Sequence, residues 1–337
     1  MTETMPDSAV IREAVRLACR APSLHNSQPW HWVAEGPALH LFADLTRVMT
    51  AADPEGREIY LSCGAALDHL TVAMAASGWH ANVHRFPDAD NPLHVATVDF
   101  HSSAMATTED VGARASAIGR RRTDRRPFMP PADWPEFETY LRQTVIPYQV
   151  MFDVVLDHAR PSLANASRLT EAIREYDPSY TAELGWWTSP SDTGDGIPRS
   201  ALTSAVVAGH VDVGRTFPAS KAGNGGEHVD FDRSRIVVLS THHEDARLDV
   251  LRCGEALSSV LLECTAAGLA TCTLTHMTEL AQSREIVREL TGQRGTPQLL
   301  IRIGRAPVAD EEPAATPRKP LSEVFEVRPS PGRGAST

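Results

Sequence analysis

Two long segments of the chain carry the same pattern of apolar and polar positions. Residues 61–78 (LSCGAALDHLTVAMAASG) align without gaps on residues 251–268 (LRCGEALSSVLLECTAAG), at a constant offset of 190 residues. Apolar side chains recur in both at the roughly 3.6-residue spacing of a buried helix, and each segment ends at a glycine typical of a helix C-cap. The pattern therefore predicts two equivalent core helices, with chance similarity between Ala/Leu-rich helices as the alternative.

An extended, strand-like run follows each of these helices and strengthens the internal repeat. The runs cover residues 93–100 in the first half of the chain and 298–303 in the second half. We therefore expect an α+β fold of two related halves, residues 1–105 and 110–327, followed by a flexible tail at 328–337.

Further regular elements are expected in the larger second half. The pattern predicts a short helix ending near Arg122, helices over 136–143 and 162–176, and strands over 149–156 and 236–240. These elements surround the predicted core helix of the second half.

Residues 177–232 form a long stretch with little periodicity and many Gly, Ser, Thr and Pro residues. Insertions of this length are usually functional lids or disordered segments. Tyr180, Trp186 and Trp187 lie early in the stretch, and such aromatic side chains favour a lid that packs on another surface. We therefore expect a loop-rich lid.

The composition is that of a folded, acidic protein. Lys and Arg number 32 against 43 Asp and Glu, and the net charge of −11 opposes general affinity for nucleic acid or an anionic membrane. No apolar run approaches the roughly 18 residues of a membrane span, and the N-terminus is unlike a secretory signal, so we expect a cytoplasmic protein. The five cysteines form no C-x-x-C pair and are expected to be buried, reduced thiols.

Basic residues are concentrated at 120–126 (RRRTDRR) despite the acidic composition. In an extended segment, Arg121, Thr123 and Arg125 point the same way and present two guanidinium groups and a hydroxyl to one phosphate. The alternative is a solvated helix end. A second basic pair, Arg318-Lys319, lies between two prolines and could close around the same phosphate.

Residues 21–30 (APSLHNSQPW) form a loop fenced by prolines and rich in small polar side chains. Ser23, Asn26 and Gln28 precede Trp30, so the loop offers hydroxyl, amide and backbone groups at one point. This chemistry suits the edge of a flat heterocycle. Ordinary turn chemistry is the alternative explanation for the prolines.

Four separated motifs together resemble the nitroreductase superfamily of flavoproteins. They are APSLHNSQPW, RRRTDRRPF, GEALSSVLLECTAAGLATCTLTH, and RIGRAP followed by PRKPLSEVF. The fusion of two halves is similar to the Acg branch of NAD(P)H nitroreductases. The resemblance implies FMN as cofactor and a single chain that imitates the usual homodimer, with further homodimerisation possible.

The resemblance implies a phosphate-binding role for two basic elements. The R-x-S/T-x-R/K element that holds the FMN phosphate in the family matches Arg121, Thr123 and Arg125. The C-terminal basic element of the family matches Arg318 and Lys319.

The resemblance also implies contacts with the flavin ring. The P-S-x-x-N loop, which reaches the flavin from the opposite subunit in family dimers, matches Pro22, Ser23, Leu24, His25 and Asn26. Gln28 of the same loop is a further candidate for cofactor binding. The backbone that faces flavin N5 and O4 matches Leu274, Thr275 and His276. The candidate substrate contacts are His25, His276, Trp186 and Trp187.

The sequence departs from the family pattern in two respects. The first half lacks the R-x-S-x-R element and the second half lacks P-S-x-x-N, so one complete flavin site is expected. Thr275-His276 replaces the usual Glu-Gly beside flavin N5, which places the redox tuning of the flavin in question.

The function implied is FMN-dependent, two-electron, ping-pong reduction of nitroaromatic or quinone-like compounds by NAD(P)H. No Rossmann G-x-G-x-x-G motif follows a strand, so the nicotinamide is expected to bind transiently. The alternative is an FMN-sequestering protein whose lid, bearing Trp186 and Trp187, covers the flavin and prevents turnover. His242-His243-Glu244-Asp245 lacks metal-ligand spacing, and we expect a surface turn and no metal site.

Overall fold

A computed structural model describes most of the chain, namely residues 6–103, 108–189, 194–217, 230–244, 246–307 and 315–329. The predicted tail at 328–337 lies, beyond residue 329, outside the described residues. The same holds for residues 190–193 and 218–229 of the predicted lid.

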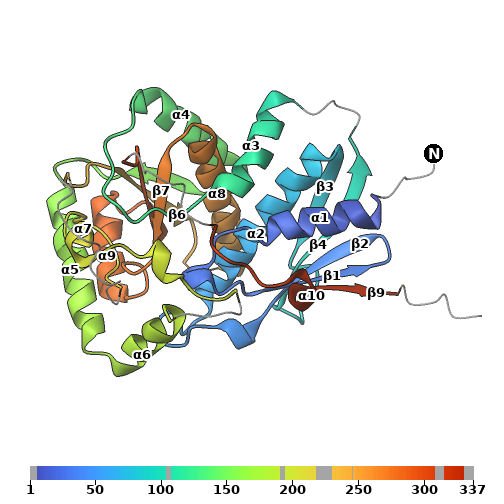
Figure 1. Cartoon of the computed structure of the whole chain (residues 1–337), viewed down its shortest axis with the longest axis horizontal. Coiled ribbons are helices and arrows are strands. Elements are labelled where there is room, and N and C mark those ends of the chain that lie inside the picture. Colours follow the sequence, from blue (N-terminus) through green and yellow to red (C-terminus); the bar gives the residue numbers. More distant parts are fainter. Residues whose placement is uncertain are drawn as a thin grey trace, which may run out of the picture.

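Two β-sheets lie at opposite ends of the molecule (Figure 1). The first sheet has the order β3-β4-β2-β1-β9 and contains β1 Trp30–Glu35, β2 Ala38–Ala43, β3 Trp79–Arg85, β4 His94–Ser102 and β9 Phe325–Arg328. The second sheet has the order β5-β6-β8-β7 and contains β5 Met151–Val154, β6 Arg235–Thr241, β7 Ala270–Leu274 and β8 Thr296–Gly304. The predicted strands at 93–100, 149–156, 236–240 and 298–303 are thereby confirmed, with ends shifted by a few residues.

The last strand, β9, belongs to the first sheet, although the strands that precede it in the sequence, β5 to β8, form the second sheet. β9 pairs in parallel with β1, placing Phe325 beside Trp32, whereas the other strand pairs in both sheets are antiparallel. The C-terminal arm therefore crosses from the second sheet to the first. This crossing carries Arg318 past the central helices, which the local pattern of the sequence does not predict.

The two predicted core helices are present and lie side by side between the sheets (Figure 1). They are α2, Arg57–Ala76, and α8, Arg247–Ala266. By length and composition α2 alone among the described helices could cross a membrane, but 78% of its apolar window is buried inside the protein. Its apolar character is that of a core helix, because it packs against α8.

The remaining helices cover the sheets and the central pair. They are α1 Ser8–Ala18, α3 Glu109–Arg120, α4 Trp134–Val145, α5 Arg160–Glu175, α6 Pro178–Trp187, α7 Ala205–Ala208, α9 Ala281–Leu290 and α10 Leu321–Val324. Short 3₁₀ turns occur at Leu24–Asn26, Leu45–Arg47, Ile146–Tyr148 and Arg199–Ala201. The predicted helices that end near Arg122 or cover 136–143 and 162–176 correspond to α3, α4 and α5 and are confirmed.

The prediction that 177–232 is loop-rich throughout is wrong for its first part. Asp177 caps α6 by accepting hydrogen bonds from the backbone N–H groups of Ser179 and Tyr180, and Pro178 favours the first helical position. Trp187 is buried, whereas the Trp186 side chain is 63% exposed. The helix escaped prediction because its apolar residues pack on Met49 and neighbouring residues without forming a regular stripe.

All five cysteines are free and buried, as predicted from their apolar surroundings. Burial raises the pKa of the Cys19 thiol to about 12, and it raises the pKa values of Cys63, Cys253, Cys264 and Cys272 as well. These thiols therefore stay protonated and unreactive at neutral pH.

Candidate functional site

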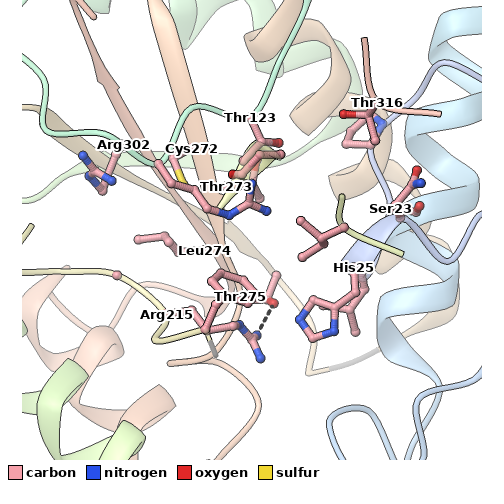
Figure 2. A pocket seen from close by; sticks show the side chains of 18 of the residues that line it. Ser23, His25, Thr123, Arg215, Cys272, Thr273, Leu274, Thr275, Arg302 and Thr316 are labelled. Atoms are coloured by element: carbon pink, nitrogen blue, oxygen red, sulfur yellow. Dashed lines mark hydrogen bonds between the residues drawn. The ribbon is translucent and has the colours of Figure 1, made fainter. Parts of the chain in front are cut away.

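A cavity of about 490 Å³ lies between the central helices and the edge of the second sheet. Its walls come from the 22–26 loop, the start of α2, residues 121–125, residues 197–217 and the end of β7 (Figure 2). This volume falls within the range of about 300–1,000 Å³ that is typical of cofactor and small-molecule sites. The cavity is therefore the candidate functional site.

The basic segment after α3 runs in extended form along one wall of the cavity. Thr123 forms a parallel bridge with Thr271, and Asp124 donates a backbone hydrogen bond of 2.9 Å to the Thr271 carbonyl. Because successive side chains of an extended segment alternate in direction, Arg121 and Arg125 face the same way as Thr123. All three residues line the cavity.

Three guanidinium groups lie at this wall, those of Arg121, which is buried, and of Arg125 and Arg318, which are partly buried. Arg125 donates a hydrogen bond of 3.0 Å to the Ala201 carbonyl. In the described parts of the chain, none of the three groups forms an ion pair with a carboxylate. Burial and the positive charges of Arg20 and Arg122 lower the pKa of Arg121 to about 10. Burial, Arg121 and Arg20 lower the pKa of Arg318 to about 9, and burial also lowers the pKa of Arg125.

These lowered pKa values show that the cluster holds positive charge without compensation. An anion placed beside these guanidinium groups would offset their burial and, for Arg121 and Arg318, the repulsion from neighbouring positive charges. The Nε of Arg121 is buried and has no hydrogen-bond partner among the described residues. The residues present therefore fit a phosphate group, with Thr123 as an additional hydroxyl donor.

The two side chains of the C-terminal basic pair, Arg318 and Lys319, make different contacts. Arg318 lines the cavity, and its guanidinium donates to the carbonyls of Cys19 (2.9 Å) and Arg20 (3.0 Å) at the end of α1. Lys319 is not among the residues that line the cavity, because its Nζ pairs with Glu323 of α10 at 2.9 Å. Of this pair, only Arg318 is in position to act on a ligand.

The proline-fenced loop supplies another wall, through Pro22, Ser23, Leu24, His25 and Asn26. Its backbone is strained: φ is +47° at His25, +61° at Asn26 and +52° at Gln28. Non-glycine residues rarely adopt such values, and they persist only where surrounding contacts hold them. The contacts of two side-chain amides account for this strain.

Asn26 and Gln28 fasten the loop to two distant segments. The Asn26 amide donates to the carbonyls of Gly194 (3.1 Å), Gly196 (3.0 Å) and Pro317 (3.2 Å). Gln28 donates to the Gly194 carbonyl at 2.9 Å and accepts from the Lys319 backbone N–H at 3.0 Å. Gln28 does not line the cavity, so its role in the structure is to hold the loop against the segments that contain Gly194 and Lys319.

His25 projects from this loop toward Arg215 and Thr275 on the opposite wall (Figure 2). Both ring nitrogens are buried, and neither has a hydrogen-bond partner in the described ranges of the chain. Burial and the positive charges of Arg215 and Arg125 lower the pKa of His25 well below its ordinary value. The imidazole is therefore neutral and can offer a ligand one donor and one acceptor.

The end of β7 contributes Leu274 and Thr275 to the cavity, but His276 turns away. Thr275 Oγ1 accepts a hydrogen bond of 3.1 Å from Arg215, which is drawn in Figure 2. His276 is fully buried behind the strand end, where its Nε2 lies 2.8 Å from Ser167 Oγ. Trp186 and Trp187 do not line the cavity either.

Several lining residues were not expected from the sequence, notably Glu58 and Ser62 of α2, Leu257 of α8, and Arg215. A signal for Glu58 was available: a charged pair, Arg57-Glu58, precedes a long apolar helix. Arg215 carried no such signal, because its position depends on contacts with Tyr180 and Glu279 from remote elements.

The cavity combines a cationic end with a long, mostly neutral wall. Its apolar sides include Leu61, Leu257, Leu274 and Leu299. This arrangement suits an elongated ligand that carries a phosphate at one end and a flat aromatic group at the other. Among the residues that the structure describes, no group of three or more His, Cys, Asp or Glu side chains could hold a metal ion.

Comparison with known proteins places the chain in a family. "Putative NAD(P)H nitroreductase acg" of Mycobacterium tuberculosis H37Rv is 54% identical over 97% of this chain and 98% of that protein. "Uncharacterized protein Rv3127" and "Putative NAD(P)H nitroreductase Rv3131" of the same strain are 50% and 36% identical, with 96% and 97% of this chain covered and 95% and 94% of those proteins. No protein-family profile matches the chain.

Solved structures with lower similarity carry related descriptions. The FMN-dependent nitroreductase NfnB of Mycobacterium smegmatis, solved with NADPH, is 16% identical with a TM-score of 0.39 and covers 64% of this chain and 97% of its own. A protein from Anabaena variabilis described as "a putative nitroreductase" is 10% identical with a TM-score of 0.47 and covers 88% of this chain and 73% of its own. From the close sequence relatives, the chain belongs to the nitroreductase superfamily, in its Acg-like branch, and the resemblance read from the four motifs is confirmed.

Proposed function

We propose that this protein binds FMN and uses NAD(P)H to reduce nitroaromatic or quinone-like compounds by two electrons. The observation that carries the proposal is the cluster of guanidinium groups at one end of a cofactor-sized cavity, which have no carboxylate partner in the part of the chain that the structure describes. The name of the 54% identical relative supports the NAD(P)H-dependent reaction class.

Particular residues would hold the cofactor. Arg121, Thr123 and Arg125 would bind the FMN phosphate, with Arg318 adding positive charge beside Arg121. The ring would lie along the end of β7, within reach of the 22–26 loop. When bound, the flavin supplies the electron-transfer chemistry, and the protein contributes binding and orientation.

The chain's own residues would shape the reaction space. His25 would offer a neutral hydrogen-bonding group at the side of the cavity facing Arg215 and Thr275. The 197–217 segment would exclude water from one side. Because one cavity would serve both the electron donor and the acceptor, they would bind in turn, as a ping-pong sequence requires.

We also propose that the chain acts as a dimer within one polypeptide, and that a second copy is not required for a complete site. The predicted first half, 1–105, would supply the 22–26 loop, and the predicted second half, 110–327, would supply the arginine cluster. One site of this composition can form per chain, because each half lacks the other's motif.

An FMN-sequestering protein without turnover is the second candidate. The observation that favours it is that the segment from Asp195 to Arg215, which lines one side of the cavity, is held by an ion pair at each end. Asp195 pairs with Arg47, and Arg215 pairs with Glu279. Trp186 and Trp187, expected to provide the cover, are not part of this lining segment.

Spectroscopy of the purified protein separates the two candidates. The absorbance bands of oxidised flavin in protein freed of unbound FMN would support cofactor binding. Rapid mixing with excess NADH or NADPH without oxygen should then bleach these bands if the protein is a reductase. Persistent oxidised bands with either nucleotide would overturn the reductase proposal and favour sequestration.

A further inference from the structure

Glu58 is a buried carboxyl group that lines the cavity from the first turn of α2. The helix start does not need its side chain. Asp53 accepts the backbone N–H groups of Arg57 (2.9 Å) and Glu58 (2.8 Å) and so caps the helix itself. The Glu58 carboxyl group is therefore available for the cavity.

The position of Glu58 is set by its neighbour Arg57. Its Oε1 accepts a hydrogen bond of 2.6 Å from Arg57, and among the described residues no protein group hydrogen-bonds to Oε2. Arg57 is in turn fixed by Thr278 (3.2 Å) and by the backbone carbonyl and side chain of Gln298 (2.7 and 2.9 Å). One oxygen of Glu58 is thus anchored and the other is left for a ligand.

Charged groups from several elements face Glu58. They are Arg57 of α2, Asp53 before it, Glu279 before α9, Arg215 of the covering segment and Cys253 of α8. Burial, together with the negative charges of Asp53 and Glu279, outweighs the positive charge of Arg57 and raises the pKa of Glu58 to about 8. The side chain therefore carries a proton at neutral pH.

We propose that Glu58 is the general acid that delivers the proton consumed when a quinone-like acceptor is reduced in this cavity. The inference rests on the proposed function. Reduction of a quinone by NAD(P)H yields a hydroquinone and NAD(P)⁺, and it consumes one hydride equivalent from the nucleotide and one proton. The O–H bond of Glu58 breaks, its electron pair stays on the carboxylate, and a new O–H bond forms on the quinone oxygen.

The neighbours of Glu58 suit this role. After transfer, the carboxylate remains hydrogen-bonded to Arg57, which offsets its charge. Water entering the cavity restores the proton before the next turnover. A purely structural role would require only the Oε1 contact with Arg57, and glutamine provides that contact equally well. Glu58→Gln therefore removes the proton while it keeps the anchor.

The first test measures the proton directly and does not depend on turnover. The full-length protein, as purified, is labelled with ¹³C at the glutamate carboxyl carbon and titrated by NMR. Burial also raises the pKa values of Glu171 and Glu255, so the Glu58 resonance is assigned as the one that is missing in Glu58→Gln. We expect that resonance to titrate well above the ordinary glutamate value of 4.5. If the resonance that is lost in Glu58→Gln titrates near the ordinary value, the proposal is overturned.

The second test isolates the acceptor step. The bound flavin is reduced with dithionite, so NAD(P)H is not needed, and the protein is then mixed with 1,4-naphthoquinone in a stopped-flow instrument. Glu58→Gln should slow reoxidation by about 100-fold or more, the usual contribution of a general acid. The wild-type rate should fall as the pH rises through the Glu58 pKa, whereas the rate of the variant should not show this decline.

Glu285→Gln is the matched control, because Glu285 lies on α9, outside the cavity lining, and pairs with nearby Arg288 at 2.8 Å. It should reoxidise at the wild-type rate. An unchanged rate and pH profile in Glu58→Gln would overturn the role of Glu58, whether or not NAD(P)H reduces the flavin. A wild-type protein that NAD(P)H cannot reduce, but in which Glu58→Gln still slows the quinone step, would contradict only the proposed electron donor.

Discussion

Gly64 of α2 and Gly254 of α8 make the same contact with each other's helix. A Cβ atom added to Gly64 would lie 2.0 Å from the Leu251 carbonyl oxygen, and one added to Gly254 would lie 2.1 Å from the Leu61 carbonyl oxygen. The offset of 190 residues that relates the repeats also relates these two contacts. Such reciprocity is the property of a two-fold interface, and it supports the proposal of a dimer within one chain.

Gly64→Ala should destabilise the protein by about 3 kcal/mol or more, because the two helices must separate to accept the methyl group. Urea unfolding followed by circular dichroism measures the change. Gly112→Ala in α3 is the control, since its Cβ meets no atom within 4 Å. That variant should be neutral or more stable by about 0.5–1 kcal/mol. Equal stability of Gly64→Ala and wild type would contradict the close helix contact.

Removing one guanidinium group should weaken FMN binding. Arg121→Ala and Arg125→Ala each lose a charged contact worth about 1.5–3 kcal/mol, so the Kd for FMN should rise about 10- to 100-fold. Fluorescence quenching of FMN on binding provides the measurement. Arg120→Ala, at an exposed position one residue before the cluster, is the control and should bind FMN normally.

Without FMN, Arg121→Ala should not lower the thermal stability of the protein. Because Arg121 is buried beside other positive charges, Arg121→Ala should retain or raise the Tm of the FMN-free protein. Added FMN should then raise the Tm of the wild type more than that of the variant. A lower Tm for the FMN-free variant would show that the guanidinium has a structural role instead.

Loss of the Asn26 amide should increase the mobility of the segments to which it is hydrogen-bonded, residues 194–196 and Pro317. Asn26→Gly removes three hydrogen bonds to backbone carbonyls but relieves the left-handed strain, whereas Asn26→Ala removes the same bonds and retains the strain. Both variants should speed FMN release and hydrogen exchange near residues 194–197. Asn26→Ala should also be less stable than Asn26→Gly, by about 1 kcal/mol. Unchanged hydrogen exchange in both variants would contradict this role.

Glu58 should make the stability of the protein depend on pH. Its pKa in the folded protein is raised from the ordinary 4.5 to about 8, so the folded state holds the proton more tightly than the unfolded state. The contribution of Glu58 to the free energy of unfolding should therefore fall as the pH rises from about 5 to about 8. Glu58→Gln should flatten this dependence in urea titrations, and an unchanged slope would contradict the raised pKa.

Buried histidines should act in the opposite pH direction. Burial lowers the pKa values of His25, His69 and His276 well below 6.5, so the unfolded state binds more protons below that value. The contribution of these histidines to the free energy of unfolding should therefore fall as the pH drops below about 6.5. His69→Gln should reduce this loss, as measured by urea unfolding between about pH 5 and pH 7. An unchanged loss would contradict the neutral state of His69.

The sequence alone predicted the elements and motifs that depend on local pattern. Periodic apolar residues identified α2 and α8, because burial of one helix face or a whole helix imposes a regular spacing. Alternation along an extended segment predicted that Arg121, Thr123 and Arg125 face one way. The motifs identified the family, and the close relatives confirmed it.

Only the tertiary structure decided which polar groups share the cavity. Glu58 and Arg215 reach it through contacts between remote elements, while Lys319 and His276 turn toward other partners. The C-terminal arm brings Arg318 to the cavity because β9 pairs with β1 across the molecule. Local patterns report burial and spacing along the chain, but the direction of an individual side chain depends on long-range packing, which they do not contain.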